Sequence, residues 1–329
     1  MKITVIGAGA IGGLVGVKLA LAGEDVTFIV RGQNLEAIGA NGIRLITDEG
    51  TEHTARNVTA TNDYVKAGPQ DMVILAMKAH QAAAVANDLP RLFGPKTVVV
   101  TMQNGIPFWY FHKHGGALEG SRIRSVDSTG LIRERIPPER LIGCVVYPAS
   151  ELVAPGVIKH IEGNRFPVGE LDGSSSARVQ QVSECFTNAG FKSPVLGDIR
   201  AEIWLKLWGN LTFNPISALT RSTLVDICQY PLTRELAAAM MIEAQNVANK
   251  LGITFRVPLE KRISGAESVG KHKTSMLQDV EAGREPEIDA LVGSVVELAR
   301  LTNTPTPHID SVYALTKLLA KTIAEERPC

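Results

Sequence analysis

A glycine-rich segment near the amino terminus restricts the fold of this chain more than any other feature. The β-branched run Lys2–Ile6 passes directly into Gly7, Ala8, Gly9, Ala10, Ile11 and Gly12, and an apolar-periodic segment continues to Ala22. This order predicts a strand, a tight turn and a helix, and Asp25–Val30 predicts a second strand. In such a unit the first glycine makes the turn, the second lets the backbone approach a pyrophosphate, and the third lets the helix lie close to the strand. The segment therefore predicts a dinucleotide site with the phosphates at the helix amino terminus; a plain glycine turn is the alternative.

The residue after the second strand indicates which dinucleotide binds. NAD sites usually have an Asp or Glu about 20 residues after the glycines, bonded to the ribose 2′-hydroxyl, whereas a 2′-phosphate needs a cation. Arg31 stands in that place, while Glu24 and Asp25 come too early, at the entrance of the strand. The pattern favours NADP(H) over NAD(H). The alternative is that Arg31 is an ordinary solvated residue, because exposed arginines are common.

Length, charge and cysteine content narrow the class of protein. At 329 residues the chain exceeds the size at which one core usually stops growing, so two domains are expected. Lysine plus arginine and aspartate plus glutamate number 34 each, which favours neither nucleic acid nor a charged membrane surface as a partner. Because the chain passes straight from Met1 into a predicted strand and has no apolar stretch of membrane-spanning length, we expect neither a signal peptide nor a membrane span. The scattered cysteines Cys144, Cys185, Cys228 and Cys329 lack metal-site spacing, so we expect a cytoplasmic protein with no metal.

Two polar clusters follow two further apolar runs. Asp71–Met77 and Thr97–Met102 are typical of strands in a parallel sheet covered on both faces. The first ends in Lys78-Ala79-His80-Gln81 and the second in Gln103-Asn104-Gly105. In open α/β sheets, ligands bind at the carboxyl ends of the strands. Lys78 and Asn104 are therefore expected on the ligand-binding edge.

Weaker patterns predict the shorter elements of the first half. They are helices over Gln33–Ala40, Gln81–Leu89 and Ala177–Ala189, the last capped by the serines at 174–176, and strands over Ile43–Ile46, Val58–Ala60, Cys144–Tyr147, Gly156–Ile161 and Arg165–Gly169. The strands at Ile43–Ile46 and Val58–Ala60 are expected to frame a polar hairpin.

The stretch from Pro107 to Pro138 has a weaker pattern. It contains the aromatic run Phe108–Phe111, followed by His112 and His114. A metal site needs three or four ligands, and no third ligand is suggested nearby. We therefore expect a lid or a surface loop here.

Beyond Asp198 the strand-like runs end and helical periodicity dominates. Helices are predicted over Ile199–Asn210, Ala218–Thr220 with the residues that follow, Thr233–Leu251, Leu259–Gly283, Glu287–Leu301 and His308–Glu325. Such a half cannot bind the dinucleotide alone, so we expect it to bring substrate groups to the nicotinamide and to offer a contact for a homodimer.

The first of these helices has polar residues at regular spacing. Lys206, Asn210 and Asn214 recur every four residues among tryptophans and leucines, so they share one stripe if the helix persists to Pro215. Burying such a stripe is costly without polar partners, which a bound substrate would supply. The alternative is an ordinary solvated helix face.

Five motifs together resemble the ketopantoate reductase (2-dehydropantoate 2-reductase) family. They are GAGAIGG at the amino terminus, MKAHQ, QNG, RAEIWLKLWGNLTFNP and SMLQDVEAGREPEID, and they span almost the whole chain. The resemblance implies NADPH-dependent reduction of an α-keto acid, ketopantoate, to its 2-hydroxy acid, a step of pantothenate and coenzyme A biosynthesis. It also implies Lys206 as general acid with Glu287 as its acidic companion. By the same resemblance Arg31 and Lys78 bind NADPH, and Asn104 lies between cofactor and lysine.

The resemblance also assigns the substrate-binding residues. Asn210, Asn214 and Ser275 are implied to bind the substrate. One position differs, because His272 stands where family members often have a substrate-binding asparagine three residues before the serine. The segment from Pro107 to Pro138 also looks longer and more aromatic than in compact members. Both features bear on substrate identity and leave the reaction type unchanged.

The chemistry of the residues agrees with this mechanism independently. Hydride arriving at a carbonyl carbon leaves negative charge on the oxygen, which a positioned ammonium can stabilise and protonate. Lys206 fits that role. Glu287 follows Pro286 near a helix start, where a carboxylate is also favoured by the helix dipole alone.

The sequence thus predicts an α/β protein with a doubly wound, Rossmann-type NADP-binding domain over 1–198 and an all-helical substrate and catalytic domain over 199–329. Three functional hypotheses remain: ketopantoate reductase, a relative that reduces another small α-keto or carbonyl compound, and a non-catalytic NADP(H)-sensing module. Lys206 and Glu287 argue against the sensor, because binding alone needs neither an acid nor its partner.

Overall fold

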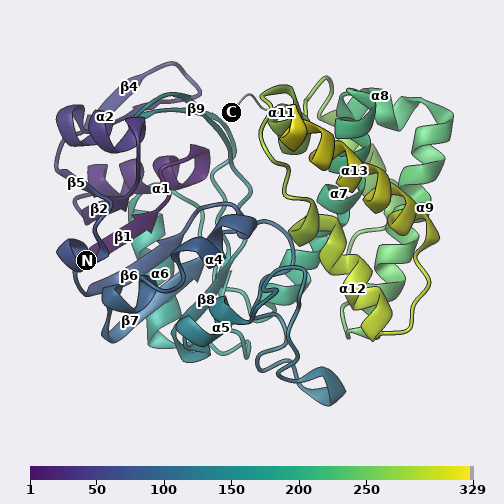
Figure 1. Cartoon of the computed structure of the whole chain (residues 1–329), viewed down its shortest axis with the longest axis horizontal. Coiled ribbons are helices and arrows are strands. Elements are labelled where there is room, and N and C mark those ends of the chain that lie inside the picture. The colour runs from purple at the N-terminus through teal and green to yellow at the C-terminus, as the bar shows by residue number, and fades with distance from the viewer. Residues whose placement is uncertain (327–329) are drawn as a thin grey trace. The chain divides into compact units, whose positions relative to one another are not determined.

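Figure 1 shows the computed structural model, which describes residues 1–326; Cys329 lies outside the described residues. The chain forms two compact units. Unit 1 comprises Met1–Gln103, Phe111–Arg122 and Thr129–Ile199. Unit 2 comprises Asn104–Tyr110, Ile123–Ser128 and the residues from Arg200 onward. Two short pieces from the first half of the sequence therefore belong with the helical second half.

Unit 1 is built on a seven-stranded sheet in the order β11-β8-β7-β6-β1-β2-β5. Every neighbouring pair is parallel except β11 and β8. The strands are β1 (Lys2–Ile6), β2 (Asp25–Ile29), β5 (Val58–Thr61), β6 (Gln70–Leu75), β7 (Phe93–Thr101), β8 (Leu141–Cys144) and β11 (Val168–Gly169). The chain runs outward from β1 to β2 and β5, then returns to β6 on the other side of β1. This reversal of strand order confirms the predicted doubly wound fold and puts a switch point beside β1.

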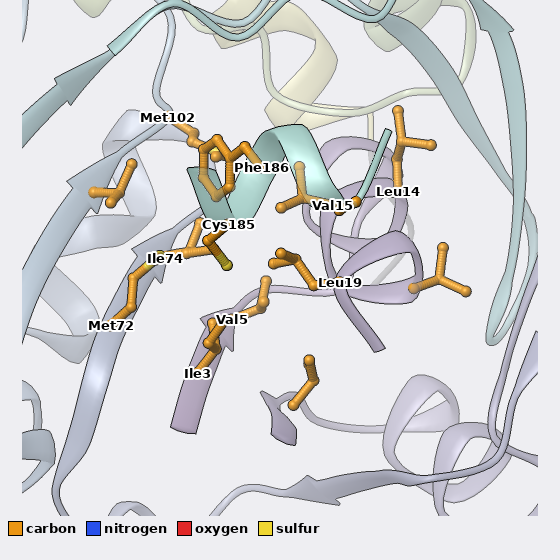
Figure 2. Close-up of a cluster of buried hydrophobic side chains, with 14 of the residues drawn as sticks. Ile3, Val5, Leu14, Val15, Leu19, Met72, Ile74, Met102, Cys185 and Phe186 are labelled. Carbon is orange, nitrogen blue, oxygen red and sulfur yellow. The ribbon is translucent and has the colours of Figure 1, made fainter. Parts of the chain in front are cut away.

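The centre of this sheet is covered on both faces. Val73, Ile74 and Leu75 of β6 and Val98, Val99 and Val100 of β7 are all buried, as predicted. On one face, side chains of β1 and β6 meet residues of α1 (Ala10–Leu21) and α6 (Ala177–Asn188), as Figure 2 shows. Cys185 of α6 belongs to this cluster, and burial raises the pKa of its thiol to about 12. It is therefore a packing residue and a poor nucleophile.

A second sheet of four strands was not predicted. Its order is β4-β3-β10-β9, with β3 (Ile43–Ile46), β4 (Glu52–Ala55), β9 (Ala149–Ala154) and β10 (Val157–Glu162). Strands β3 and β4 form the hairpin, so the expectation that Ile43–Ile46 and Val58–Ala60 frame it was wrong. Residues Val58–Thr61 instead form β5, which pairs with β2 in the large sheet.

Helix α1 packs against both sheets. A Cβ on Gly16 would lie 2.3 Å from the Phe28 ring of β2, and a Cβ on Gly13 would lie 2.3 Å from the Ile158 side chain of β10. Lys18 is the one polar side chain of this helix, and most of its other residues are buried. Glycines let it approach both layers closely.

The remaining helices of unit 1 are short. They are α2 (Gln33–Asn41), α3 (Tyr64–Ala67), α4 (Ala82–Val85), α5 (Leu131–Arg135) and the 3-10 turns η1 (Ala79–Gln81), η2 (Leu89–Leu92), η3 (Gly116–Leu118) and η4 (Pro138–Arg140). The predicted helix Gln81–Leu89 is therefore only one α-turn between two 3-10 turns. The predicted cap of α6 is confirmed, because Ser176 Oγ accepts from the Val179 N–H at 3.2 Å.

The aromatic run Phe108–Phe111 is not a surface loop, contrary to expectation. All four side chains are at least 96% buried. Phe108, Trp109 and Tyr110 belong to unit 2 and Phe111 to unit 1. His112 and His114 follow in unit 1, where the Phe111 and His114 rings meet edge to face at 5.2 Å. Burial lowers the pKa of His112, which opposes its protonation near neutral pH.

Between Ile199 and Glu326 the structure contains helices and no strand, which confirms the predicted helical second half. The helices are α7 (Ile199–Thr220), α8 (Leu224–Gln229), α9 (Pro231–Lys250), α10 (Leu259–Ser268), α11 (Ser275–Glu281), α12 (Ser294–Leu301) and α13 (Pro307–Glu325), with a π-turn η5 (Asp289–Gly293) before α12. The predicted helix Leu259–Gly283 is two helices, because Gly270 has a positive φ and Thr274 caps α11. No helix among residues 1–326 is long and apolar enough to cross a membrane.

Candidate functional site

The turn between β1 and α1 requires glycine at both ends. Gly7 has φ +92°, a conformation that other L-residues rarely adopt. A Cβ on Gly12 would lie 1.9 Å from the Gly7 carbonyl oxygen and 2.8 Å from Ala76 Cβ. The helix can therefore lie this close to the turn only with glycine at 12, which is the role that the sequence predicts.

At Gly9, by contrast, neither the backbone conformation nor the surrounding protein requires a glycine. It precedes α1 with φ −74°, which any residue can adopt, and a Cβ there would meet no protein atom within 4 Å. The space in front of this residue is open, at the point where the first N–H groups of α1 point outward without helical partners. This turn fits a pyrophosphate, because a side chain at 9 would occupy the place where a phosphate approaches.

Two expected cofactor residues lie near this turn in the fold of unit 1. Arg31 is exposed and follows β2, a neighbour of β1 in the sheet. Lys78 is half-buried and follows β6, the neighbour of β1 on the other side. Both thus come from carboxyl ends of strands that flank the switch point, where dinucleotides bind in this class of sheet.

Lys206 lies on α7 among large buried side chains. Trp204 and Trp208 are fully buried, whereas Lys206 is half-buried. Its Nζ donates to Asn104 Oδ1 at 2.5 Å. The structure thus brings together two expected site residues that are 102 positions apart. The amide oxygen stabilises the charged ammonium and fixes its direction.

The segment Asn104–Tyr110 is anchored to α7 at its other end as well. The Trp204 Nε1–H donates to the Tyr110 hydroxyl at 2.8 Å, and Arg200 Nε donates to the Tyr110 carbonyl at 2.8 Å. Trp204 and Tyr110 are fully buried, so this hydrogen bond satisfies an indole N–H that water cannot reach.

The polar stripe on α7 persists because the helix continues through Pro215 to Thr220. Pro215 has no N–H to donate to the Leu211 carbonyl, yet the helix does not end there. Asn210 is half-buried, and Asn214 is only 5% exposed. An ordinary solvated face does not describe Asn214, so that alternative is wrong at this position.

Glu287 is half-buried and stands just before the π-turn Asp289–Gly293. The turn is held from two sides. The Ala290 carbonyl accepts from the Ile106 N–H at 3.1 Å and from Ser294 Oγ at 2.7 Å. The Asp289 carboxylate accepts from the Tyr313 hydroxyl at 2.7 Å and from Lys317 Nζ at 3.0 Å. Burial and the bond to Asp289 raise the pKa of Tyr313, so its hydroxyl stays a donor at neutral pH.

The two remaining expected residues come from another part of unit 2. Ser275 is exposed and is the first residue of α11. His272 is half-buried in the link between α10 and α11, where its carbonyl accepts from the Leu224 N–H at 3.1 Å. The backbone of this link is therefore held by a hydrogen bond, and Ser275 beside it is exposed.

The sequence did not predict the backbone contacts of residues 105 and 106 or the anchoring role of Tyr110. The glycine in QNG was the only signal for them, and it gives no information about Ala290. Among residues 1–326, no three His, Cys, Asp or Glu side chains lie together as metal ligands would.

Comparisons with known proteins agree with this architecture. The family model described as "Ketopantoate reductase PanE/ApbA" matches residues 3–173, and the model of the family's C-terminal part matches residues 198–320. A 2-dehydropantoate 2-reductase of Mesorhizobium japonicum is 54% identical over 97% of this chain and 98% of its own. The crystal structure of a protein proposed to be a ketopantoate reductase from Ralstonia solanacearum MolK2 is 40% identical, with a TM-score of 0.93 and 98% of both chains covered.

A more distant structure shares the fold. D-mandelate dehydrogenase, solved with NADH and anilino(oxo)acetate, is 22% identical with a TM-score of 0.84, covering 98% of this chain and 99% of its own. At that identity the likeness concerns the fold alone. The two family models together match most of the chain, on both sides of the change from sheet to helices. The chain therefore belongs to the ketopantoate reductase family of nicotinamide-dependent reductases.

Proposed function

We propose that this chain catalyses the NADPH-dependent reduction of 2-dehydropantoate (ketopantoate) to pantoate. The observation that supports it most is the hydrogen bond between Lys206 Nζ and Asn104 Oδ1, 2.5 Å long. It holds a half-buried ammonium in a fixed direction, in a chain 54% identical to a 2-dehydropantoate 2-reductase. An oriented acid is what reduction of a carbonyl requires beyond a hydride donor.

Unit 1 would bind the cofactor. The pyrophosphate would rest on the open space at Gly9 and on the first N–H groups of α1. Arg31 would bind the 2′-phosphate, because an exposed cation and no carboxylate follows β2. Lys78 would add a second positive charge from the end of β6. When bound, the reduced nicotinamide supplies a hydride to the carbonyl carbon of the substrate.

Unit 2 would supply the proton and hold the substrate. As hydride reaches the carbonyl carbon, the C=O π pair moves to oxygen, and the Lys206 ammonium gives that oxygen its proton. The products are the 2-hydroxy acid and NADP⁺, and the lysine regains its proton from solvent. Glu287 would be the acidic companion of Lys206. Asn104 would keep the ammonium aimed, since its amide oxygen accepts one of the three N–H groups.

The carboxylate and hydroxyl groups of the substrate would be bound by four residues of unit 2: Asn210, Asn214, Ser275 and His272. Asn214 is only 5% exposed, and its amide would offer both donors and an acceptor to a polar substrate. His272 motivates the second candidate, a relative that reduces another small α-keto acid. An imidazole is larger than the amide that family members often have there, so it changes the space open to a substrate.

The test measures NADPH oxidation by the purified chain against a panel of α-keto acids that includes ketopantoate. We expect the highest kcat/KM with ketopantoate. A higher kcat/KM with another member would favour the second candidate, and NADPH binding without oxidation of any member would favour the sensor. We also expect a homodimer, which sedimentation velocity would measure.

A further inference from the structure

Residues 104–106 make contacts in two directions within unit 2. The Asn104 side chain accepts from Lys206 Nζ at 2.5 Å, and the Ile106 N–H donates to the Ala290 carbonyl at 3.1 Å. Ala290 belongs to the π-turn that starts two residues after Glu287. Residues 104–106 thus contact both Lys206, the expected general acid, and the π-turn that follows Glu287, its expected acidic companion.

Gly105 lies between these two contacts. The atoms that leave no room for a side chain at this position are backbone atoms of Ala290. Its φ is +88°. A Cβ there would lie 2.0 Å from the Ala290 carbonyl oxygen and 2.5 Å from the carbonyl carbon. Ordinary contacts between such atoms are about 3.5 Å. Backbone cannot rotate away as a flexible side chain can, so any larger residue must displace residues 104–106 or the π-turn.

The π-turn is itself held firmly from behind. Tyr313 and Lys317 bind Asp289, and Ser294 Oγ donates to the same Ala290 carbonyl that Ile106 uses. Displacement on the side of residues 104–106 is therefore the easier response to a side chain at 105. Such a displacement moves the Asn104 amide away from Lys206.

We propose that Gly105 is a positioning residue: its lack of a side chain lets one backbone segment aim the Lys206 ammonium through Asn104 while bonding the turn next to Glu287. The effect on turnover rests on the proposed function, whereas the effect on the lysine does not. A misplacement of about 1 Å at a reacting group can lower a rate about 10²-fold. Losing the Asn104 acceptor also disfavours the protonated lysine relative to the free amine.

The experiment compares Gly105→Ala with Gly252→Ala. Gly252 is also in unit 2 and has φ +81°, but a Cβ there would meet no atom within 4 Å. Both variants therefore carry the conformational cost of a side chain at positive φ, and only Gly105→Ala collides with the π-turn. Three quantities are measured on the full chain: kcat with the best α-keto acid, the Kd of NADPH, and the rate at which an amine-acylating reagent modifies Lys206 at fixed pH, followed by mass spectrometry.

We expect Gly105→Ala to lower kcat by roughly 10- to 100-fold, because a reacting group would be misplaced. The Kd of NADPH should stay within about twofold of wild type. We expect acylation of Lys206 to become several-fold faster, because more of the lysine is unprotonated. Gly252→Ala should match wild type in all three. Unchanged acylation of Lys206 in Gly105→Ala would overturn the proposal. If the wild type reduces no α-keto acid but the acylation rate still rises, the proposed function fails and the positioning role stands.

If Gly105→Ala does not fold, the Ser294→Ala variant tests the same positioning of Lys206. It removes the second donor to the Ala290 carbonyl without adding an atom. A looser π-turn should also raise the acylation rate of Lys206, by a smaller factor than expected for Gly105→Ala. An acylation rate equal to wild type in this variant would overturn the proposal.

Discussion

The glycine turn of unit 1 is formed by residues 7–12, which are consecutive, whereas the surroundings of Lys206 in unit 2 come from segments far apart in the sequence. In the turn, each requirement is local: a positive φ at Gly7 and a close approach at Gly12. Around Lys206, the requirements connect Asn104 to α7 and Ile106 to Ala290. A structural constraint among neighbouring residues, as in the glycine turn, produces a recognisable pattern in the sequence. A contact between distant segments, as around Lys206, does not, because the sequence does not show which residues are partners.

The largest expected effect tests the distant assembly. Lys206→Ala should lower kcat by roughly 10²- to 10⁴-fold, the usual contribution of a general acid. The Kd of NADPH should change little, because the phosphates would bind to the glycine turn. Steady-state kinetics and NADPH titration measure the two quantities separately. Lys250→Ala, at the exposed end of α9, is the control and should behave as wild type. Wild-type turnover by Lys206→Ala would remove the catalytic assignment.

The same comparison extends to Glu287. Glu287→Ala should also lower kcat, and the double variant with Lys206→Ala should lose less than the product of the two factors, because residues that act as a unit are not additive. Losses that multiply would show that the two residues act independently.

The second expected effect tests the local side of the comparison. Arg31→Ala should lower kcat/KM for NADPH by roughly 10- to 100-fold, since a hydrogen bond to a charged group contributes about 1.5–3 kcal/mol. The rate with NADH, which lacks the 2′-phosphate, should be nearly unchanged. Initial rates with both cofactors measure this, with Arg44→Ala of β3 as an exposed arginine control. A wild type that uses NADH and NADPH equally well would contradict the cofactor assignment.

The third expected effect separates binding from folding within the turn. Gly9→Ala should weaken NADPH binding by roughly tenfold, or about 1.4 kcal/mol, and leave the Tm unchanged, because φ is −74° and the added Cβ meets no protein atom. Gly12→Ala is the counterpart, because its Cβ would collide with the Gly7 carbonyl and should destabilise the fold by about 1–3 kcal/mol. Fluorescence titration and thermal unfolding measure the two properties. A Tm lowered equally in both variants would contradict the open space at Gly9.

The fold shows the same division between local and distant requirements. The central parallel strands β1, β2, β6 and β7 and the helices α9 and α13 were predictable, because an apolar run or helical periodicity marks each of them within its own residues. The second sheet was missed, since β10 pairs with β3, which lies about a hundred residues earlier in the sequence, and β9 joins the sheet only through β10. One local sign existed: apart from Lys18, α1 has no polar side chain, which indicates a helix covered on more than one side.

The site divides in the same way. Lys206, Asn210 and Asn214 were predictable as one stripe, since helical spacing is local. The contact of Ile106 with Ala290 was not, because a backbone hydrogen bond is independent of side-chain identity. The aromatic run was misassigned for a related reason: Tyr110 is buried by contacts with α7, about 90 residues later, and its own neighbours in the sequence do not indicate this.

The smallest expected effect tells whether the far end of the segment Asn104–Tyr110 also aims Lys206. Tyr110→Phe removes the acceptor of the buried Trp204 indole N–H, and leaving such a donor unsatisfied should lower the free energy of unfolding by about 1 kcal/mol. We expect kcat to stay within about twofold of wild type. Asn104 and Ile106 lie at the opposite end of the segment from Tyr110, and their own hydrogen bonds to Lys206 and Ala290 remain in this variant. Denaturant unfolding and steady-state kinetics measure both, with Tyr230→Phe, an exposed tyrosine, as control. A fall in kcat as large as that expected for Gly105→Ala would mean that the whole segment positions the lysine as one rigid piece. Its orientation would then depend on packing along α7 as well as on the bond to Asn104.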